Sequence, residues 1–396
     1  MGPVNANLTP PLHEPTADQL RAAGSMKWTS FPGKIGAWVA EMDFGTAGPI
    51  TRALHEAVDA GIFGYLPAAT SLRMSEAYTA WAARHYGWQV DPADVHPVAD
   101  VLAALELTIE FFTEPGSAVV LPTPAYMPFL TVPLLHGRRI IQVPMAREGE
   151  RYVYDLDALD AAFADGGGLL VLCNPHNPIG RVLERAEMVA VSEVVERHGA
   201  RVFSDEIHAP LVYAPGRHVP YASVSETAAG HTITATSASK AWNLPGLKCA
   251  QVVVSNDADR ARWREHGKSF EHGAANLGVV ANTAAYTEGG LWLTEVLTYL
   301  DGNRRRLAEL VAEHLPGVRY TPPEGTYLAW LDFREVELPE SAASPTAFLA
   351  SRADVATTDG AMCGDAGQGF VRYNFATPRP IMEETIAAMG RALRGA

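Results

Sequence analysis

The sequence predicts an α/β fold built from two domains, on three observations. First, its 396 residues exceed the roughly 250 to 300 residues that a single hydrophobic core usually serves. Second, short runs rich in β-branched residues alternate with amphipathic helical stretches through the first two-thirds of the chain. Third, these runs are apolar on both sides of the strand alternation, which is typical of a parallel sheet covered by helices on both faces. We therefore expect a large, mainly parallel α/β/α domain.

The strands expected in this large domain follow one another with helices between them. They comprise residues 118–121, 139–143, 169–173, 200–203, 232–236 and 251–255. The segment 183–198 is typical of the intervening helices, because its apolar side chains recur at helical spacing.

The last third of the chain predicts a smaller α+β domain. Helical patterns dominate from about residue 277 to 315, and strand-like runs over 326–332 and 370–375 precede a closing helix over 381–393. The proline-rich segment before Trp38 is too short to fold alone, so we expect it to pack on this C-terminal unit. The predicted boundaries are 45–285 for the large domain, and 1–44 together with 286–396 for the small one.

Composition and charge exclude several classes of protein. The net charge of −14 argues against a nucleic-acid partner, which needs a clustered basic face. No stretch approaches the roughly 18 consecutive apolar residues of a membrane span, and the absence of Lys and Arg from the first 20 residues does not fit a secretory signal. Cys173, Cys249 and Cys363 are too few and too scattered for a disulfide framework or a metal site. We expect a cytoplasmic protein without a metal ion.

Two reactive residues follow predicted strands. Asp205 comes just after the strand at 200–203, and Lys240 lies 35 positions further on, in a serine-flanked turn after the strand at 232–236. An amine that can form an imine and a carboxylate that can pair with a pyridinium nitrogen are the minimum a protein needs to use pyridoxal phosphate (PLP). Either residue alone would indicate a solvated loop or a surface turn. A third motif, Cys173 to Gly180 with its Asn-Pro-His-Asn-Pro core, follows another strand and favours the PLP interpretation.

These motifs resemble those of fold-type I PLP enzymes of the aspartate aminotransferase superfamily, in which an Asn-Pro loop, a strand-end Asp and a serine-flanked Lys occur in this order. Further landmarks lie at residues 38–44, 64–65, 122–126, 243–248 and 371–374, so the resemblance covers nearly the whole chain. The tryptophan-led first landmark, the Pro-His-Asn-Pro loop and the histidine at 208 look most like the carbon-sulfur β-lyase branch, which includes the cystathionine β-lyases of the MalY and PatB type. The resemblance implies an aspartate-aminotransferase-like fold of type I.

The resemblance also implies roles for residues around the cofactor ring. Lys240 would carry PLP covalently and move the substrate α-proton, and Asp205 would keep the pyridine nitrogen protonated. Asn177 and His208 would reach the phenolate oxygen of the cofactor. Tyr126 would stack on the ring and could protonate a leaving group. For Asn177 a plain turn residue remains an alternative, and for His208 and Tyr126 a packed core residue.

The cofactor phosphate needs fixed hydrogen-bond donors. We expect these to be Ser237, Ser239, Lys248 and the backbone N–H groups of Val101 and Leu102 at a helix start. The sequence departs from the superfamily at Asp100, where glycine is usual. An acid beside a phosphate is repulsive, so Asp100 must point away or the phosphate must bind elsewhere.

Substrate binding is implied by a second set of residues. Arg372 would clamp the α-carboxylate through its guanidinium fork, with Ala40 and Asn177 nearby. Tyr65 matches a tyrosine that, in the superfamily, reaches the cofactor phosphate of the neighbouring subunit, so a homodimer with shared active sites is implied. Pro210 stands where the β-lyase branch commonly has an acid, which leaves the natural substrate open.

Two reactions share these residues. A β-lyase would cleave L-cysteine S-conjugates or cystathionine to a thiol, pyruvate and ammonia, whereas an aminotransferase of class I or II would pass the amino group to a keto acid. The Trp38 motif and His208 favour the lyase. A protein that binds the cofactor without catalysis, and an unrelated α/β enzyme with chance motifs, stay as further alternatives.

Overall fold

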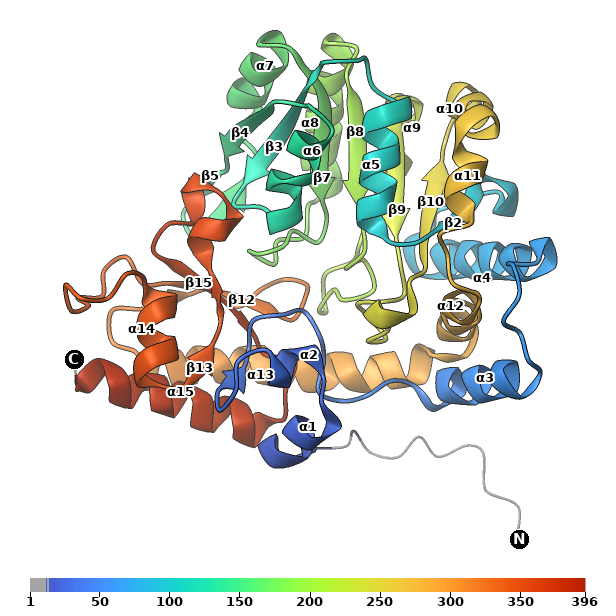
Figure 1. Ribbon diagram of the computed structural model, residues 1–396. Coiled ribbons are helices and arrows are strands. Elements are labelled where there is room, and N and C mark those ends of the chain that lie inside the picture. Colours follow the sequence, from blue (N-terminus) through green and yellow to red (C-terminus); the bar gives the residue numbers. More distant parts are fainter. Residues whose placement is uncertain (1–11, 13, 396) are drawn as a thin grey trace, which may run out of the picture.

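The computed structural model describes residue 12 and residues 14–395. Seven strands form one sheet in the order β2-β10-β9-β8-β7-β3-β4 (Figure 1). All pairs from β9 to β4 are parallel, whereas β10 runs antiparallel to both β9 and β2. The mainly parallel sheet predicted from the sequence is therefore confirmed. Its strands are β2 (Val95–Val98), β3 (Ala118–Thr123), β4 (Ile140–Pro144), β7 (Gly167–Cys173), β8 (Arg201–Asp205), β9 (Thr232–Thr236) and β10 (Ala250–Val254).

The edge strand β2 was not predicted. Its Val-His-Pro-Val sequence contains Pro97, which cannot donate to a ladder and is tolerated at a sheet edge. Such a short strand has no pattern that separates it from a loop.

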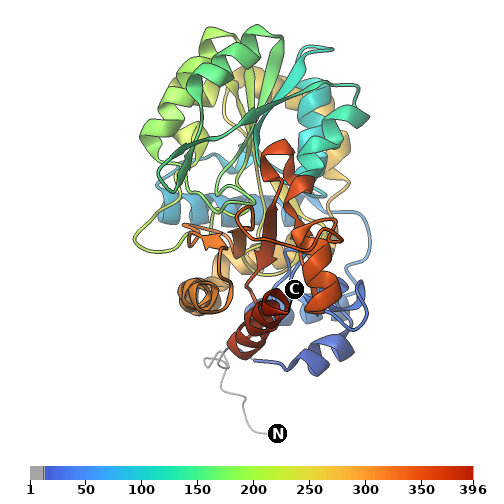
Figure 2. The same ribbon diagram turned by 90° about the vertical axis from the view of Figure 1, so that its left-hand side faces the viewer.

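Helices cover both faces of this sheet, as Figure 2 shows. Alternate strand residues pack into two separate cores: Val119 and Leu121 face one, and Val120 faces the other. The first core includes α5 (Val101–Phe111), and the second includes α7 (Leu156–Ala164), α8 (Arg185–Arg197) and α9 (Glu226–His231). Around these lie α3 (Gly48–Asp59), α4 (Ala68–Tyr86), α6 (Val132–Leu135), α10 (Asp257–Arg262), the π-helical turn Trp263–Gly267, α11 (Lys268–Glu271), α12 (Asn276–Glu288) and the hairpin of β5 (Ala146–Glu148) and β6 (Arg151–Val153).

The C-terminal third forms a smaller α+β unit below the large sheet in Figure 1. An antiparallel sheet has the order β11-β12-β15-β14. The division at residues 45 and 285 stays a prediction, and α12 runs through residue 285. The elements of this unit are α13 (Gly290–His314), β11 (Arg319–Tyr320), β12 (Leu328–Asp332), α14 (Pro345–Arg352), β13 (Val355–Ala356), β14 (Thr358–Asp359), β15 (Phe370–Asn374) and α15 (Arg379–Arg394). No helix in the described part of the chain is long and apolar enough to cross a membrane.

The N-terminal segment packs on this smaller unit, as expected. After α1 (Ala17–Ala23) and α2 (Met26–Thr29), strand β1 (Ile35–Gly36) pairs in parallel with β13. Most of the proline-rich start of the chain, residues 1–11 and 13, lies outside the described residues.

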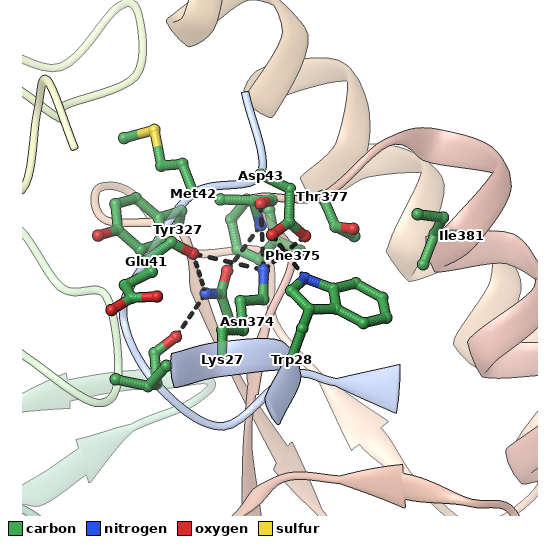
Figure 3. Close-up of polar contacts among 12 residues, drawn as sticks. Lys27, Trp28, Glu41, Met42, Asp43, Tyr327, Asn374, Phe375, Thr377 and Ile381 are labelled. Atoms are coloured by element: carbon green, nitrogen blue, oxygen red, sulfur yellow. Dashed lines mark hydrogen bonds and ion pairs between the residues drawn. The ribbon is translucent and has the colours of Figure 1, made fainter. Parts of the chain in front are cut away.

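A buried ion pair fixes this segment in place (Figure 3). The Lys27 ammonium lies 2.7 Å from the Asp43 carboxylate, and the two side chains are 0% and 2% exposed. The Trp28 indole N–H donates to the other Asp43 oxygen at 2.8 Å. Breaking such a pair leaves a buried charge uncompensated, which costs about 3–5 kcal/mol. The ion pair therefore holds α2 firmly against the chain at Asp43.

Candidate active site

A cavity of about 470 Å³ lies at the carboxyl ends of the parallel strands, where the smaller unit meets the large sheet. Open α/β sheets bind ligands at this edge, because the loops that leave neighbouring strands diverge there. Most of the predicted site residues line this one cavity, although they come from positions 40 to 372 of the chain. They are Ala40, Val101, Leu102, Tyr126, Asn177, Asp205, His208, Ser239, Lys240, Lys248 and Arg372.

Lys240 places its amine inside the cavity, in the turn after β9. The amine donates to the carbonyl of Ala40 at 3.2 Å. Burial, together with the positive charge of Arg372, lowers the pKa of Lys240 from 10.5 to about 8. A substantial fraction of this amine is therefore neutral near physiological pH, as a nucleophile or a base must be.

Asp205 ends strand β8 on the floor of the cavity. One carboxylate oxygen accepts the Ile207 backbone N–H at 3.1 Å, and the other accepts the Cys173 thiol at 3.7 Å. Burial raises the pKa of Asp205 to about 7. No Lys, Arg or His of the described residues forms an ion pair with it. The site therefore has the chemistry to receive a protonated nitrogen, which would restore the carboxylate to its charged form.

Arg372 and Asn177 meet across the cavity. The buried guanidinium of Arg372 donates to the Asn177 side-chain oxygen at 3.1 Å, to the Trp38 carbonyl at 2.8 Å and to the Thr358 hydroxyl at 3.2 Å. Burial lowers the pKa of Arg372. These contacts fix the plane of the guanidinium, so that its fork is preorganised for a carboxylate.

His208 and Tyr126 supply neutral polar groups. Burial, reinforced by the nearby charges of Lys240 and Arg372, lowers the pKa of His208 to about 3, and its Nδ1 has no hydrogen-bond partner within the described residues. Burial raises the pKa of Tyr126, so its phenol keeps a proton at neutral pH. The imidazole is therefore uncharged, and the phenol can donate.

The predicted phosphate end of the cavity lies at the start of α5. Asp100 caps this helix by accepting the Ala103 N–H at 2.9 Å, and its second oxygen pairs with Lys248 at 2.8 Å. The acid is thus engaged by a helix terminus and a cation. Ser237 does not line the cavity: its hydroxyl donates to the Cys249 carbonyl at 2.7 Å and accepts the Ser239 N–H at 3.0 Å. This hydroxyl orders the loop that carries Ser239.

Tyr65 also lies outside the cavity of its own chain. Its side chain is 95% exposed in the connection between α3 and α4, beside the 68% exposed Phe63. Both line a shallow pocket that shares Lys248 with the cavity. A role for Tyr65 in binding the cofactor or the substrate thus needs a second subunit, and it stays a prediction.

Several residues that line the cavity were missed. They are Trp38, Val39, Met127, Pro128, Thr131, Ile207 and Pro245. Each lies within five positions of a predicted site residue, so closeness in the sequence to those residues could have indicated them.

The three cysteines, Cys173, Cys249 and Cys363, are all buried and unpaired. Burial raises the pKa of each thiol, to about 12 for Cys249 and about 11 for Cys363, and well above the ordinary value for Cys173. All three are therefore protonated at neutral pH. Within the described residues, no group of three or more His, Cys, Asp or Glu side chains is arranged to hold a metal ion.

Comparison with known proteins gives the family. The sequence profile of aminotransferase class I and II matches residues 39–389. The chain belongs to this family. It is 40% identical to cystathionine beta-lyase of Corynebacterium glutamicum, over 96% of this chain and 99% of that one. It is 32% identical to cystathionine beta-lyase PatB of Bacillus subtilis, over 90% and 92% of the two chains. Among solved structures, cystalysin from Treponema denticola, which contains a pyridoxal 5'-phosphate cofactor, superposes with a TM-score of 0.88 at 27% identity, over 94% and 96% of the chains. The predicted family and fold type are confirmed.

The cofactor of the family, PLP, fits this cavity by its chemistry. The buried Asp205 lacks a cation, and the buried Nδ1 of His208 lacks a partner in the part of the chain described. Lys240 presents an amine with a lowered pKa, and the N-terminus of α5 offers backbone N–H groups. A ring nitrogen, a phenolate, an aldehyde and a phosphate each find a matching group here.

Proposed function

We propose that the protein is a PLP-dependent carbon-sulfur β-lyase, which cleaves L-cysteine S-conjugates or cystathionine to a thiol, pyruvate and ammonia. The observation that carries the proposal is full-length similarity to cystathionine beta-lyases, at 40% identity over 96% of this chain. The cavity supports it, because Lys240, Asp205 and Arg372 all line it. The similarity favours the lyase over the aminotransferase.

Each residue has a place in this reaction. The Arg372 fork binds the substrate α-carboxylate, and this orients the α-carbon toward the Lys240 amine, which removes the α-proton as a base. Bound PLP supplies an electron sink for the electrons of that C–H bond. Asp205 would keep a proton on the ring nitrogen of PLP, and Asn177 and His208 would donate to its phenolate oxygen. The protonated phenol of Tyr126 can deliver a proton to the departing sulfur.

We also propose a homodimer that shares its active sites. A single chain exposes Tyr65 at 95% and Phe63 at 68% beside the cavity. Large apolar groups exposed this close to a site favour coverage by a second subunit.

The three unpaired cysteines favour the cytoplasm as the location of the protein.

The decisive experiment offers the purified enzyme L-cystathionine and S-substituted cysteines without any keto acid. Stoichiometric release of pyruvate and thiol is the expected result. Turnover that requires an added keto acid, with no pyruvate from S-substituted cysteines, would instead identify an aminotransferase.

The pKa values predict how cofactor capture depends on pH. Since the neutral amine attacks the aldehyde, the rate at which cofactor-free protein captures PLP should rise with pH, with a midpoint near 8, the pKa of Lys240. Asp205 acts in the same direction, because its carboxyl loses its proton near pH 7. The visible absorption of the holoenzyme measures capture. In Arg372→Met the midpoint should move upward, because a positive charge that lowers the pKa of Lys240 is gone. A wild-type midpoint near 10 would contradict this prediction.

A further inference from the structure

The segment 38–45 lies between the two cationic groups of the site, and its backbone carbonyls contact both. The Trp38 carbonyl accepts from Arg372 at 2.8 Å. The Ala40 carbonyl accepts from Lys240 at 3.2 Å and from the buried phenol of Tyr327 at 3.0 Å. The position of this segment therefore sets where the Lys240 amine finds its hydrogen-bond acceptor.

One side chain holds the segment on both sides of Ala40. The Asn374 amide nitrogen donates to the carbonyls of Val39 and Glu41, each at 2.7 Å. Its oxygen accepts the Ala376 N–H at 2.7 Å, so both ends of the amide are bound. The residue is 1% exposed, and Figure 3 shows it facing the chain at Glu41. Asn374 follows Arg372 by two positions on β15, so a single strand carries both residues.

The segment is held from the opposite side by the loop of Lys240. Asn243, three positions after Lys240, accepts the Met42 N–H at 2.9 Å and donates to the carbonyls of Met42 and Gly45 at 3.0 and 3.1 Å. Its φ of +59° lies in the left-handed region that asparagine tolerates better than most residues. The buried ion pair between Lys27 and Asp43 anchors the same segment a third time (Figure 3).

We propose that Asn374 is a positioning residue for Lys240, which acts by holding the Ala40 carbonyl in place against the amine. Asn374 itself does not line the cavity. A free amine in a buried site needs an acceptor that keeps it aimed at the reacting carbon, and a misplacement of about 1 Å can cost about 100-fold in rate. Asn374 binds the carbonyl on each side of Ala40. Among the described residues, loss of its N–H groups therefore leaves the Ala40 carbonyl held only by the Tyr327 phenol and the Lys240 amine themselves. The inference rests on the proposed role of Lys240.

The first test changes Asn374 in two ways in the full-length holoenzyme. Asn374→Ala removes both donors and the acceptor. Asn374→Asp keeps the shape of the side chain and the oxygen that accepts the Ala376 N–H. Its second oxygen, however, replaces the donor and is repelled by the carbonyls of Val39 and Glu41. For both variants we expect kcat/KM with an S-substituted cysteine to fall about 100-fold. We also expect the backbone amides of residues 39–43 to exchange hydrogen about tenfold faster. Wild-type values in Asn374→Asp would show that only side-chain volume matters, and would overturn the proposal.

A second variant keeps the test decisive if the Asn374 variants do not fold. Glycine adopts a positive φ without strain, so Asn243→Gly removes the bonds to Met42 and Gly45 and leaves the turn intact. We expect faster exchange of the same amides and a fall of about tenfold in kcat/KM. Unchanged exchange and kcat/KM in Asn243→Gly would count against the proposal.

Asn256→Ala is the matched control. The Asn256 amide also donates to two backbone carbonyls, those of Ala229 and Gly230 at 3.1 and 3.2 Å, but it lies beyond β10 at the opposite edge of the sheet. This variant should lower Tm and leave kcat/KM and the exchange of residues 39–43 unchanged. An equal loss of kcat/KM in Asn256→Ala, or an Asn374→Ala enzyme within about twofold of wild type, would refute the positioning role. If the wild-type protein itself neither binds PLP nor releases pyruvate, the proposed function fails first.

Discussion

Replacement of Lys240 by alanine should lower the rate of pyruvate release by about 10⁴-fold or more, because one change removes both the covalent anchor and the base. The buried amine with a pKa of about 8 has no substitute nearby: the other lysine of the cavity, Lys248, is 59% exposed and paired with Asp100. The visible absorption of the holoenzyme should also disappear. Steady-state assays with an S-substituted cysteine, together with absorption spectra, measure both effects.

The control for this variant is Lys268→Ala. Lys268 is an exposed lysine on α11 that does not line the cavity, and its loss should change neither the spectrum nor the rate. A small primary amine added to Lys240→Ala should restore part of the activity, because it replaces the missing base. Retention of more than about a tenth of the wild-type rate in Lys240→Ala would remove the basis of the proposed function.

The second large effect is expected from Asp205→Asn, which should lower kcat by about 10²- to 10³-fold. The amide is nearly isosteric with the carboxylate but carries no charge, so it cannot keep the ring nitrogen of PLP protonated. The bonds from Ile207 and Cys173 already hold the carboxylate in position. The loss should therefore appear in kcat rather than in protein stability. Steady-state kinetics and a thermal melt of the holoenzyme separate the two.

Asp205→Glu provides the comparison for this prediction. It retains the charge but moves it by one methylene, so we expect an activity between those of Asp205→Asn and wild type. If Asp205→Asn were as active as wild type, the carboxylate would have no electrostatic role, and the orientation of PLP in the cavity would have to be reversed.

The placement of the central residues could be predicted because it follows from local sequence. Asp205 is the last residue of a buried strand, and Asn177 and Lys240 each follow one by a few positions. Parallel strands bring such residues to one edge of the sheet. Apolar runs with clear boundaries made β7, β8 and β9 predictable. Once the strands are known, the order of the residues along the chain is enough to bring them together.

The contacts of the segment 38–45 could not be predicted in this way. The bond from Arg372 to the Trp38 carbonyl joins residues 334 positions apart, and that from Asn374 to Val39 joins residues 335 apart. No periodicity marks such partners, and a buried lysine near the N-terminus has the same local pattern as an exposed one. Ser237 and Ser239 posed a similar difficulty, because two serines flanking a lysine are equivalent in sequence. The turn alone directs one hydroxyl to Cys249 and leaves the other residue facing the cavity.

The role of Asp100, where the superfamily usually has glycine, could not be predicted from the sequence either. From the sequence alone, an acidic side chain next to a phosphate site predicts electrostatic repulsion. In the structure, the Asp100 carboxylate caps the start of α5 and forms an ion pair with Lys248, which offsets its negative charge. A capped helix keeps its first turn, and with it the N–H groups of Val101 and Leu102, in a fixed position.

The deeply buried thiols have a consequence for an enzyme that generates thiols. Oxidation of the released thiol gives disulfides, and a protein cysteine exchanges with such a disulfide as the thiolate rather than as the thiol. Cys173, beside the Asp205 carboxylate, and its two counterparts stay protonated. We therefore expect these buried thiols to resist mixed-disulfide formation with the oxidised product, which would protect the enzyme from inactivation by the compounds it releases.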